Sequence, residues 1–222
     1  MSSAQLIVAS LALPAAGALG IFLAGGRPRL RKAAALATSA LLFACVLGLL
    51  PVVWAGGVPQ LFVLEMLPNV ALGFRVEPLG MLFALAASGL WLASTLRGGG
   101  THHALAIAAA VGIAFAANLA TLGLLCALLT TLTRPRIWLL VAALALLLPA
   151  IVATWSFAGT LEFLPGGILR GKVSGAALGG LLAFYLLGIG TWALAPQRHW
   201  LRAGAGAFAA LKVTLYVFGA SL

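Results

Sequence analysis

Long runs of apolar residues, separated by short clusters of glycine, proline and arginine, dominate this chain and restrict what it can fold into. Of the 222 residues, 64% are hydrophobic and 7% are charged, and the mean hydropathy is +1.18. Soluble domains are about half apolar and about a quarter charged, so a water-soluble globule of this size could not bury so much apolar surface. The chain is therefore predicted to be an all-α integral membrane protein, and disorder, a disulfide scaffold and a secreted enzyme are excluded.

The lengths of the apolar runs predict how often the chain crosses the bilayer. A transmembrane helix needs about 20 apolar residues, and the spans must be helices because backbone polar groups in lipid need internal partners. The runs predict a single helical membrane domain over residues 1–222, with eight spans at about 4–24, 33–54, 79–96, 104–117, 119–133, 137–157, 174–195 and 204–221. The first run lacks the basic start of a cleavable signal and is expected to be a retained helix. A mixed stretch at 58–77 is assigned to no span.

The placement of basic residues predicts the orientation. Residues 104–133 form one uncharged stretch, too long for one helix, and a tight turn at Ala117-Asn118 would divide it into two. With eight spans, one side receives nine basic residues: Arg27, Arg29, Arg31, Lys32, Arg97, Arg134, Arg136, Arg198 and Arg202. The other side receives three basic residues (Arg75, Arg170, Lys172) and all three carboxylates (Glu65, Glu77, Glu162). Cytoplasmic loops are enriched in Lys and Arg, so both termini are expected outside, in a multi-pass protein of the bacterial inner membrane.

Few side chains in this sequence can carry chemistry. Cys45 and Cys126 lie inside apolar runs and are expected to behave as small hydrophobic residues. His102-His103 follows a glycine-rich turn, where interfacial loop residues are expected. We find no cluster with the spacing of a metal, cofactor or catalytic site. The basic residues are scattered between apolar runs rather than gathered in a stripe, which argues against nucleic-acid binding despite a pI near 11.4. The chain is predicted not to be an enzyme.

Lys212 is the exception, because it lies near the middle of the last predicted span. An ammonium there costs a few kcal/mol or more unless it is paired or hydrated, and intramembrane ionisable residues often mark ion or proton paths. No carboxylate lies within any span, so Lys212 is expected to meet water, backbone carbonyls or a carboxylate of another subunit. Lys212 and His199 are the candidate residues of a proton or ion path.

Four segments of the chain resemble the N-terminal half of antiporter-like subunits, which occur in respiratory complex I, energy-converting hydrogenases and Mrp-type cation/proton antiporters. The similar segments are Leu72–Phe83, before and into the third span; Ala114–Leu122, at the tight turn; Ala158–Gly167, after the sixth span; and Gly188–Pro196 with His199-Trp200-Leu201, at the end of the seventh. The resemblance implies a role in a complex that moves ions or is driven by electron transfer, with other integral membrane subunits as partners.

The chain differs from this family at two positions where active members have charged residues inside their helices. Active members have a glutamate in the fifth helix and a lysine in the seventh, and the matching positions here are Ala127 and Thr191. The lysine of the eighth helix is retained as Lys212. The stretch between Leu201 and Ala207 looks shortened, and the chain ends after eight spans whereas full-length relatives continue.

Three hypotheses follow. The leading one is a truncated, degenerate antiporter-like subunit with a structural or scaffolding role in a hetero-oligomeric membrane complex. The second keeps proton or cation translocation through Lys212, with carboxylates from a partner subunit. The third is an accessory, space-filling subunit of a photosynthetic or respiratory complex, anchored in lipid by interfacial tryptophans such as Trp54, Trp138, Trp155 and Trp200.

Overall fold

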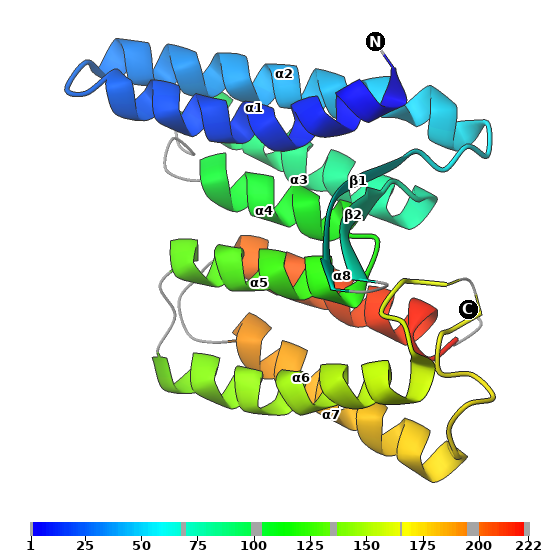
Figure 1. The fold of residues 1–222 in the computed structure, drawn as a ribbon. Coiled ribbons are helices and arrows are strands. Elements are labelled where there is room, and N and C mark those ends of the chain that lie inside the picture. Colours follow the sequence, from blue (N-terminus) through cyan, green and yellow to red (C-terminus); the bar gives the residue numbers. More distant parts are fainter. Residues whose placement is uncertain are drawn as a thin grey trace. The chain divides into compact units, whose positions relative to one another are not determined.

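Eight helices and one two-stranded sheet make up the part of the chain that the structure describes (Figure 1). The structure is a computed structural model, and it describes residues 2–67, 70–98, 104–133, 137–164, 166–194 and 200–219. In chain order the elements are α1 (Ser3–Leu23), α2 (Pro28–Trp54), β1 (Gln60–Leu67), β2 (Val70–Arg75), α3 (Pro78–Leu96), α4 (Ala104–Phe115), α5 (Leu119–Thr133), α6 (Ile137–Ala158), α7 (Gly175–Leu194) and α8 (Trp200–Tyr216).

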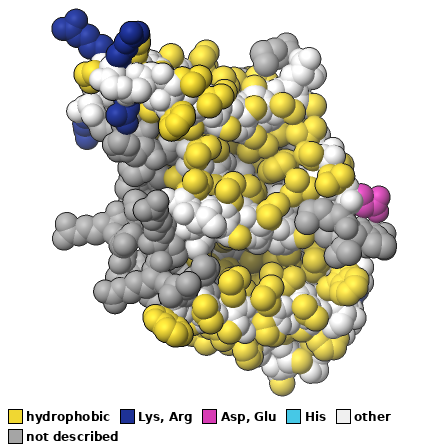
Figure 2. All heavy atoms as spheres, turned by 60° about the vertical axis from the view of Figure 1, so that its left-hand side comes forward, with side chains coloured by type: hydrophobic (Ala, Val, Ile, Leu, Met, Phe, Trp, Pro, Cys, Tyr) yellow, Lys and Arg dark blue, Asp and Glu magenta, His cyan; other side chains and the backbone are white. Residues whose placement is uncertain are grey.

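The helices have the length and composition of membrane spans. Five of those described, α1, α2, α3, α6 and α7, are long and apolar enough to cross a bilayer, whereas α4, α5 and α8 are apolar but shorter. Figure 2 shows hydrophobic side chains over most of one face, with basic side chains gathered at one corner. The prediction of an all-α membrane protein is confirmed.

The helices begin and end close to the predicted bounds, except at the C-terminal end of α8. This helix covers Trp200–Tyr216 rather than 204–221. Gly219 has a positive φ of 69°, a conformation that commonly terminates helices. The carbonyls of Tyr216 and Val217 accept hydrogen bonds from the amides of Ile168 (3.1 Å) and Leu169 (3.0 Å), so the end of the helix is paired with a preceding loop. Lys212 therefore lies about one turn from the end of α8 and not near its middle.

The mixed stretch at 58–77, which was assigned to no span, contains strands β1 and β2. β1 has the sequence QLFVLEML, in which aromatic and branched apolar residues favour an extended chain. The amide of Val76 donates to the carbonyl of Pro59 (2.9 Å) and so joins the two ends of this hairpin.

The chain divides into two compact units. The first comprises residues 1–61 and 74–115, and the second comprises residues 62–73 and 116–222. In the first unit, α2 packs against α1 and α3, and α4 packs against α1 and α3. In the second unit, α7 packs against α6 and α8, and α5 contacts α8.

Candidate functional site

The segment between α4 and α5 forms hydrogen bonds with two other segments of the second unit. Ala116–Asn118 is extended, and neighbouring segments flank it on both sides. On one side, the amide of Ala117 donates to the carbonyl of Gly73 in β2 (3.0 Å). On the other side, the amide of Phe163 donates to the carbonyl of Ala117 (3.0 Å), and Asn118 forms an antiparallel bridge with Glu162. Ala116–Asn118, called the junction below, thus lies between the hairpin and the loop that follows α6.

Asn118 joins the junction to both the hairpin and α5. Its side-chain Oδ1 accepts a hydrogen bond from the amide of Thr121 (2.7 Å), as an N-cap residue does for the first turn of a helix. Its Nδ2 donates to the carbonyl of Ala71, and the Thr121 hydroxyl accepts from the amide of Gly73 (3.1 Å). Asn118 is 1% exposed, so both ends of its amide have partners in a buried setting.

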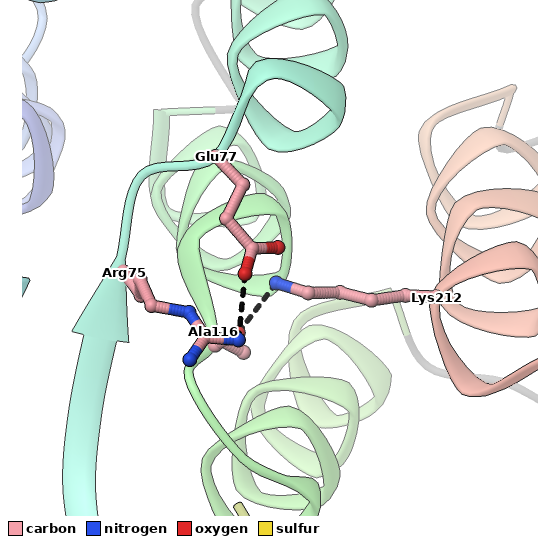
Figure 3. A network of polar contacts seen from close by, with 4 residues as sticks. All are labelled: Arg75, Glu77, Ala116 and Lys212. Carbon is pink, nitrogen blue, oxygen red and sulfur yellow. Dashed lines mark hydrogen bonds and ion pairs between the residues drawn. The ribbon is translucent and has the colours of Figure 1, made fainter. Parts of the chain in front are cut away.

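Lys212 from α8 reaches this junction. Its Nζ donates to the carbonyl of Ala116 (2.5 Å; Figure 3), and the residue is 1% exposed. The Nζ lies 5.2 Å from the centre of the Phe163 ring and 6.0 Å from that of Phe208, within the range in which a ring attracts a cation. The sequence left three environments open for Lys212: water, backbone carbonyls or a carboxylate of another subunit. The structure shows a bond to a backbone carbonyl.

A buried ion pair lies in the first unit, immediately before α3. Arg75 Nη2 is 2.6 Å from Glu77 Oε1 (Figure 3), and Glu77 is 7% exposed. The sequence placed Glu77 with the loop carboxylates, whereas the structure buries it. The spacing of Arg75 and Glu77 could have predicted this ion pair, because residues two apart in an extended chain share a face. The other oxygen, Oε2, is buried without a hydrogen bond among the described residues.

The second unit also contains an apolar cavity of about 240 Å³ between α5 and the helices α6, α7 and α8. Ala127, where the resemblance leads us to expect a glutamate, forms part of its wall together with Cys126. Thr191, where the resemblance leads us to expect a lysine, donates its hydroxyl hydrogen to the carbonyl of Leu187 in its own helix (2.7 Å). These two side chains are therefore a cavity-lining methyl group and an internally bonded hydroxyl.

The polar side chains of the cavity wall are paired with one another or with nearby groups. Trp192 Nε1 donates to the hydroxyl of Thr130 (2.5 Å), which in turn donates to the carbonyl of Cys126 (2.6 Å). The Tyr185 hydroxyl lies 2.9 Å from that of Thr154. These bonds leave a hydrocarbon surface facing the cavity.

Several residues singled out from the sequence lie outside the described residues. His199, the second candidate for an ion path, is one of these, as are His102 and His103. Cys45 and Cys126 are described and are free thiols. Within the described parts of the chain, no three His, Cys, Asp or Glu side chains form a group that could hold a metal ion.

These features define a multi-pass helical membrane protein with one buried lysine bound to a backbone carbonyl. Its fold is similar to those of chains in three solved complexes. A chain of the membrane-bound sulfane sulfur reductase, an archaeal respiratory membrane complex, matches with a TM-score of 0.75 at 14% identity, over 95% of this chain and 41% of that one. A chain of the Mrp complex from Dietzia sp. DQ12-45-1b matches with a TM-score of 0.73 at 16% identity, over 94% and 49%.

The third similar structure is respiratory complex I from Thermus thermophilus with bound aureothin. Its matching chain has a TM-score of 0.65 at 17% identity, over 94% of this chain and 53% of that one. The present chain therefore spans about half the length of the chains it matches. No protein-family model and no curated protein matches the sequence. The resemblance to complex I and Mrp-type subunits is confirmed at the level of the fold.

Proposed function

We propose that this protein is a structural subunit of a larger ion-translocating or electron-transfer membrane complex and does not move protons by itself. The observation that carries the proposal is the apolar cavity wall at Ala127, where the resemblance implies a glutamate. A proton path needs closely spaced titratable or hydrated groups. Helices α5–α8 contain no aspartate, glutamate or histidine within their bounds.

The state of Lys212 also supports a structural role. A buried ammonium is costly without partners, and here its Nζ bonds the carbonyl of Ala116 beside two aromatic rings. This contact ties α8 to the junction and therefore to the hairpin and to the loop after α6. Lys212 then stabilises the frame of the second unit rather than carrying a proton.

Purification of the full-length tagged chain from its native membrane tests the proposal. We expect other integral membrane subunits to co-purify in fixed stoichiometry, and we expect the isolated chain in proteoliposomes to give no proton or cation flux above that of empty vesicles. A lone chain that transports ions in this assay would contradict the proposal. Co-purification with pigment-binding chains alone would instead favour the accessory subunit of a photosynthetic complex.

The second candidate function is translocation through Lys212 with carboxylates from a partner subunit, and the position of an ionisable side chain in an apolar helix favours it. Replacing Lys212 by methionine separates the two functions, because it removes the charge and keeps most of the stem. For a structural role we expect the complex to assemble with unchanged ion-coupled activity and a melting temperature lowered by a few degrees. Loss of that activity in a correctly assembled complex would favour translocation.

The matched control is Lys172→Met. The Nζ of Lys172 also donates to a backbone carbonyl, that of Ala158 (2.9 Å), but the residue is exposed. Exposed polar contacts contribute little to stability, so this variant should match the wild type in assembly, activity and melting temperature. His199→Ala, examined in the same complex, tests the other candidate of the ion path.

A further inference from the structure

The cavity of the second unit has a rim that faces outward and a floor that is buried. Leu144 and Leu148 of α6 line it and are 40% and 56% exposed. Tyr185 of α7 and Val213 of α8 line it as well and are each 1% exposed. A hollow with hydrophobic walls is visible in the lower half of Figure 2. The cavity therefore extends inward from an apolar surface of the protein.

In a membrane protein, such a rim opens toward lipid. The exposed side chains that line the cavity, those of Ala127, Leu144 and Leu148, are all apolar. An empty space of this size would deprive the side chains around it of contact partners. In a bilayer, lipids can reach such an opening, and their acyl chains are as apolar as leucine.

The size and the chemistry of the cavity restrict what can fill it. The cavity measures about 240 Å³. An engineered apolar cavity of about 150 Å³ binds benzene and stays dry. The hydroxyls of Thr130 and Tyr185 are already paired, so the wall offers no free polar anchor for a headgroup from these two residues.

We propose that this cavity is a binding site for one acyl chain of a membrane phospholipid, which enters between α5 and α6 and extends toward Tyr185 and Val213. The headgroup stays outside the cavity, so the site selects for the hydrocarbon and not for the headgroup. The acyl chain fills the space that separates α5 from the α6–α7 pair.

Photo-crosslinking tests this proposal on the full chain in nanodiscs. The probes are phosphatidylethanolamine and phosphatidylglycerol, each with a diazirine in the middle of one acyl chain. We expect both lipids to label buried residues of the cavity floor, including Tyr185, to similar extents. Labelling confined to outward-facing residues would overturn the proposal, and labelling by one headgroup alone would overturn the selectivity for hydrocarbon.

A variant whose side chain fills the cavity tests whether the acyl chain enters it. A Cβ at Gly123 would find one atom within 4 Å, Ile151 Cδ1 at 4.0 Å, so Gly123→Leu can extend into the space. We expect a several-fold loss of label at Tyr185 with an unchanged or raised melting temperature. Unchanged labelling of Tyr185 in this variant would overturn the proposal.

Gly179→Leu is the matched control, since Gly179 lies on α7 outside the cavity wall and a Cβ there meets nothing within 4 Å. It should label as the wild type does. If Gly123→Leu does not fold, Ala127→Leu fills the same cavity from the next turn of α5, with the same expected loss and the same contradicting result.

Discussion

At the scale of single residues, Asn118 connects the hairpin to the start of α5. Its side chain caps α5 through Thr121 and binds the hairpin through Ala71. Loss of an N-cap side chain costs about 0.5–2 kcal/mol, and buried groups left unsatisfied cost about 1–3 kcal/mol each.

We therefore expect Asn118→Ala to lower the stability of the protein by roughly 1.5–5 kcal/mol, as the sum of these two effects. Thermal unfolding in detergent, followed by size-exclusion chromatography, measures this loss. Asn118→Ser is the control, because its hydroxyl can cap α5 and the side chain lacks the amide that donates to Ala71. Its melting temperature should fall between those of the wild type and the alanine variant. Equal losses in both variants would show that the cap contributes nothing.

The sequence identified Lys212 as the buried charge but not its partner. Apolar flanks reveal an intramembrane lysine, whereas the carbonyl of Ala116 stands 96 residues away in the chain and carries no compositional signal. For Glu77, the partner was predictable and the burial was not. The sequence shows Arg75 two residues away, whereas the burial of Glu77 depends on tertiary packing.

At the scale of elements, the end of α8 depends on a close approach of two backbones. Gly219 has a φ of 69°, and a Cβ at this position would overlap the carbonyl oxygen of Gly166. Beside it, the amides of Ile168 and Leu169 bond the last carbonyls of α8. A side chain at Gly219 would separate these segments.

We expect Gly219→Ala to raise the hydrogen-exchange rates of the Ile168 and Leu169 amides markedly. Hydrogen–deuterium exchange with mass spectrometry measures this on peptides that cover the loop. Gly171→Ala is the control, because Gly171 has a similar φ of 74° and a Cβ there meets nothing within 4 Å. It carries the same backbone strain without the overlap, so faster exchange of Ile168 and Leu169 in both variants would rule out the close approach as the cause.

The elements themselves were largely predictable, because apolar runs with Gly, Pro and Arg at their ends fix a membrane helix within a few residues. The turn at Ala117-Asn118 was also predicted from charge placement, and the structure separates α4 from α5 there. The hairpin was not predicted, although Gln60–Leu67 is rich in strand-forming residues. A single pair of strands has a weak local signal, and its pairing with the junction is long-range.

At the scale of the whole molecule, the distribution of basic residues predicts the orientation in the membrane. Arginines and lysines of cytoplasmic loops determine topology, and the α1–α2 connection carries Arg27 and is flanked by further basic residues. The hairpin lies on the side predicted to face outward.

Cysteine labelling in intact cells tests this orientation after Cys45 and Cys126 are replaced by alanine. We expect Glu65→Cys, at an exposed position of β1, to react with a membrane-impermeant maleimide. Gly26→Cys, also exposed, should react only after the cells are permeabilised. The reverse pattern would invert the topology, and labelling of both in intact cells would contradict the assignment of the α1–α2 connection to the cytoplasm.

The junction makes biosynthesis of this protein dependent on a late event. Gly73 leaves the ribosome first, Ala117 follows, and Phe163 emerges last, yet the three are joined through the same extended segment. Helix α4 has 12 residues, or about 18 Å, and falls short of a bilayer core of about 30 Å. A nascent chain halted after α4 would therefore hold a helix too short to insert alone and a hairpin without its neighbour. The junction can pair on both sides only after translation has passed the loop that follows α6.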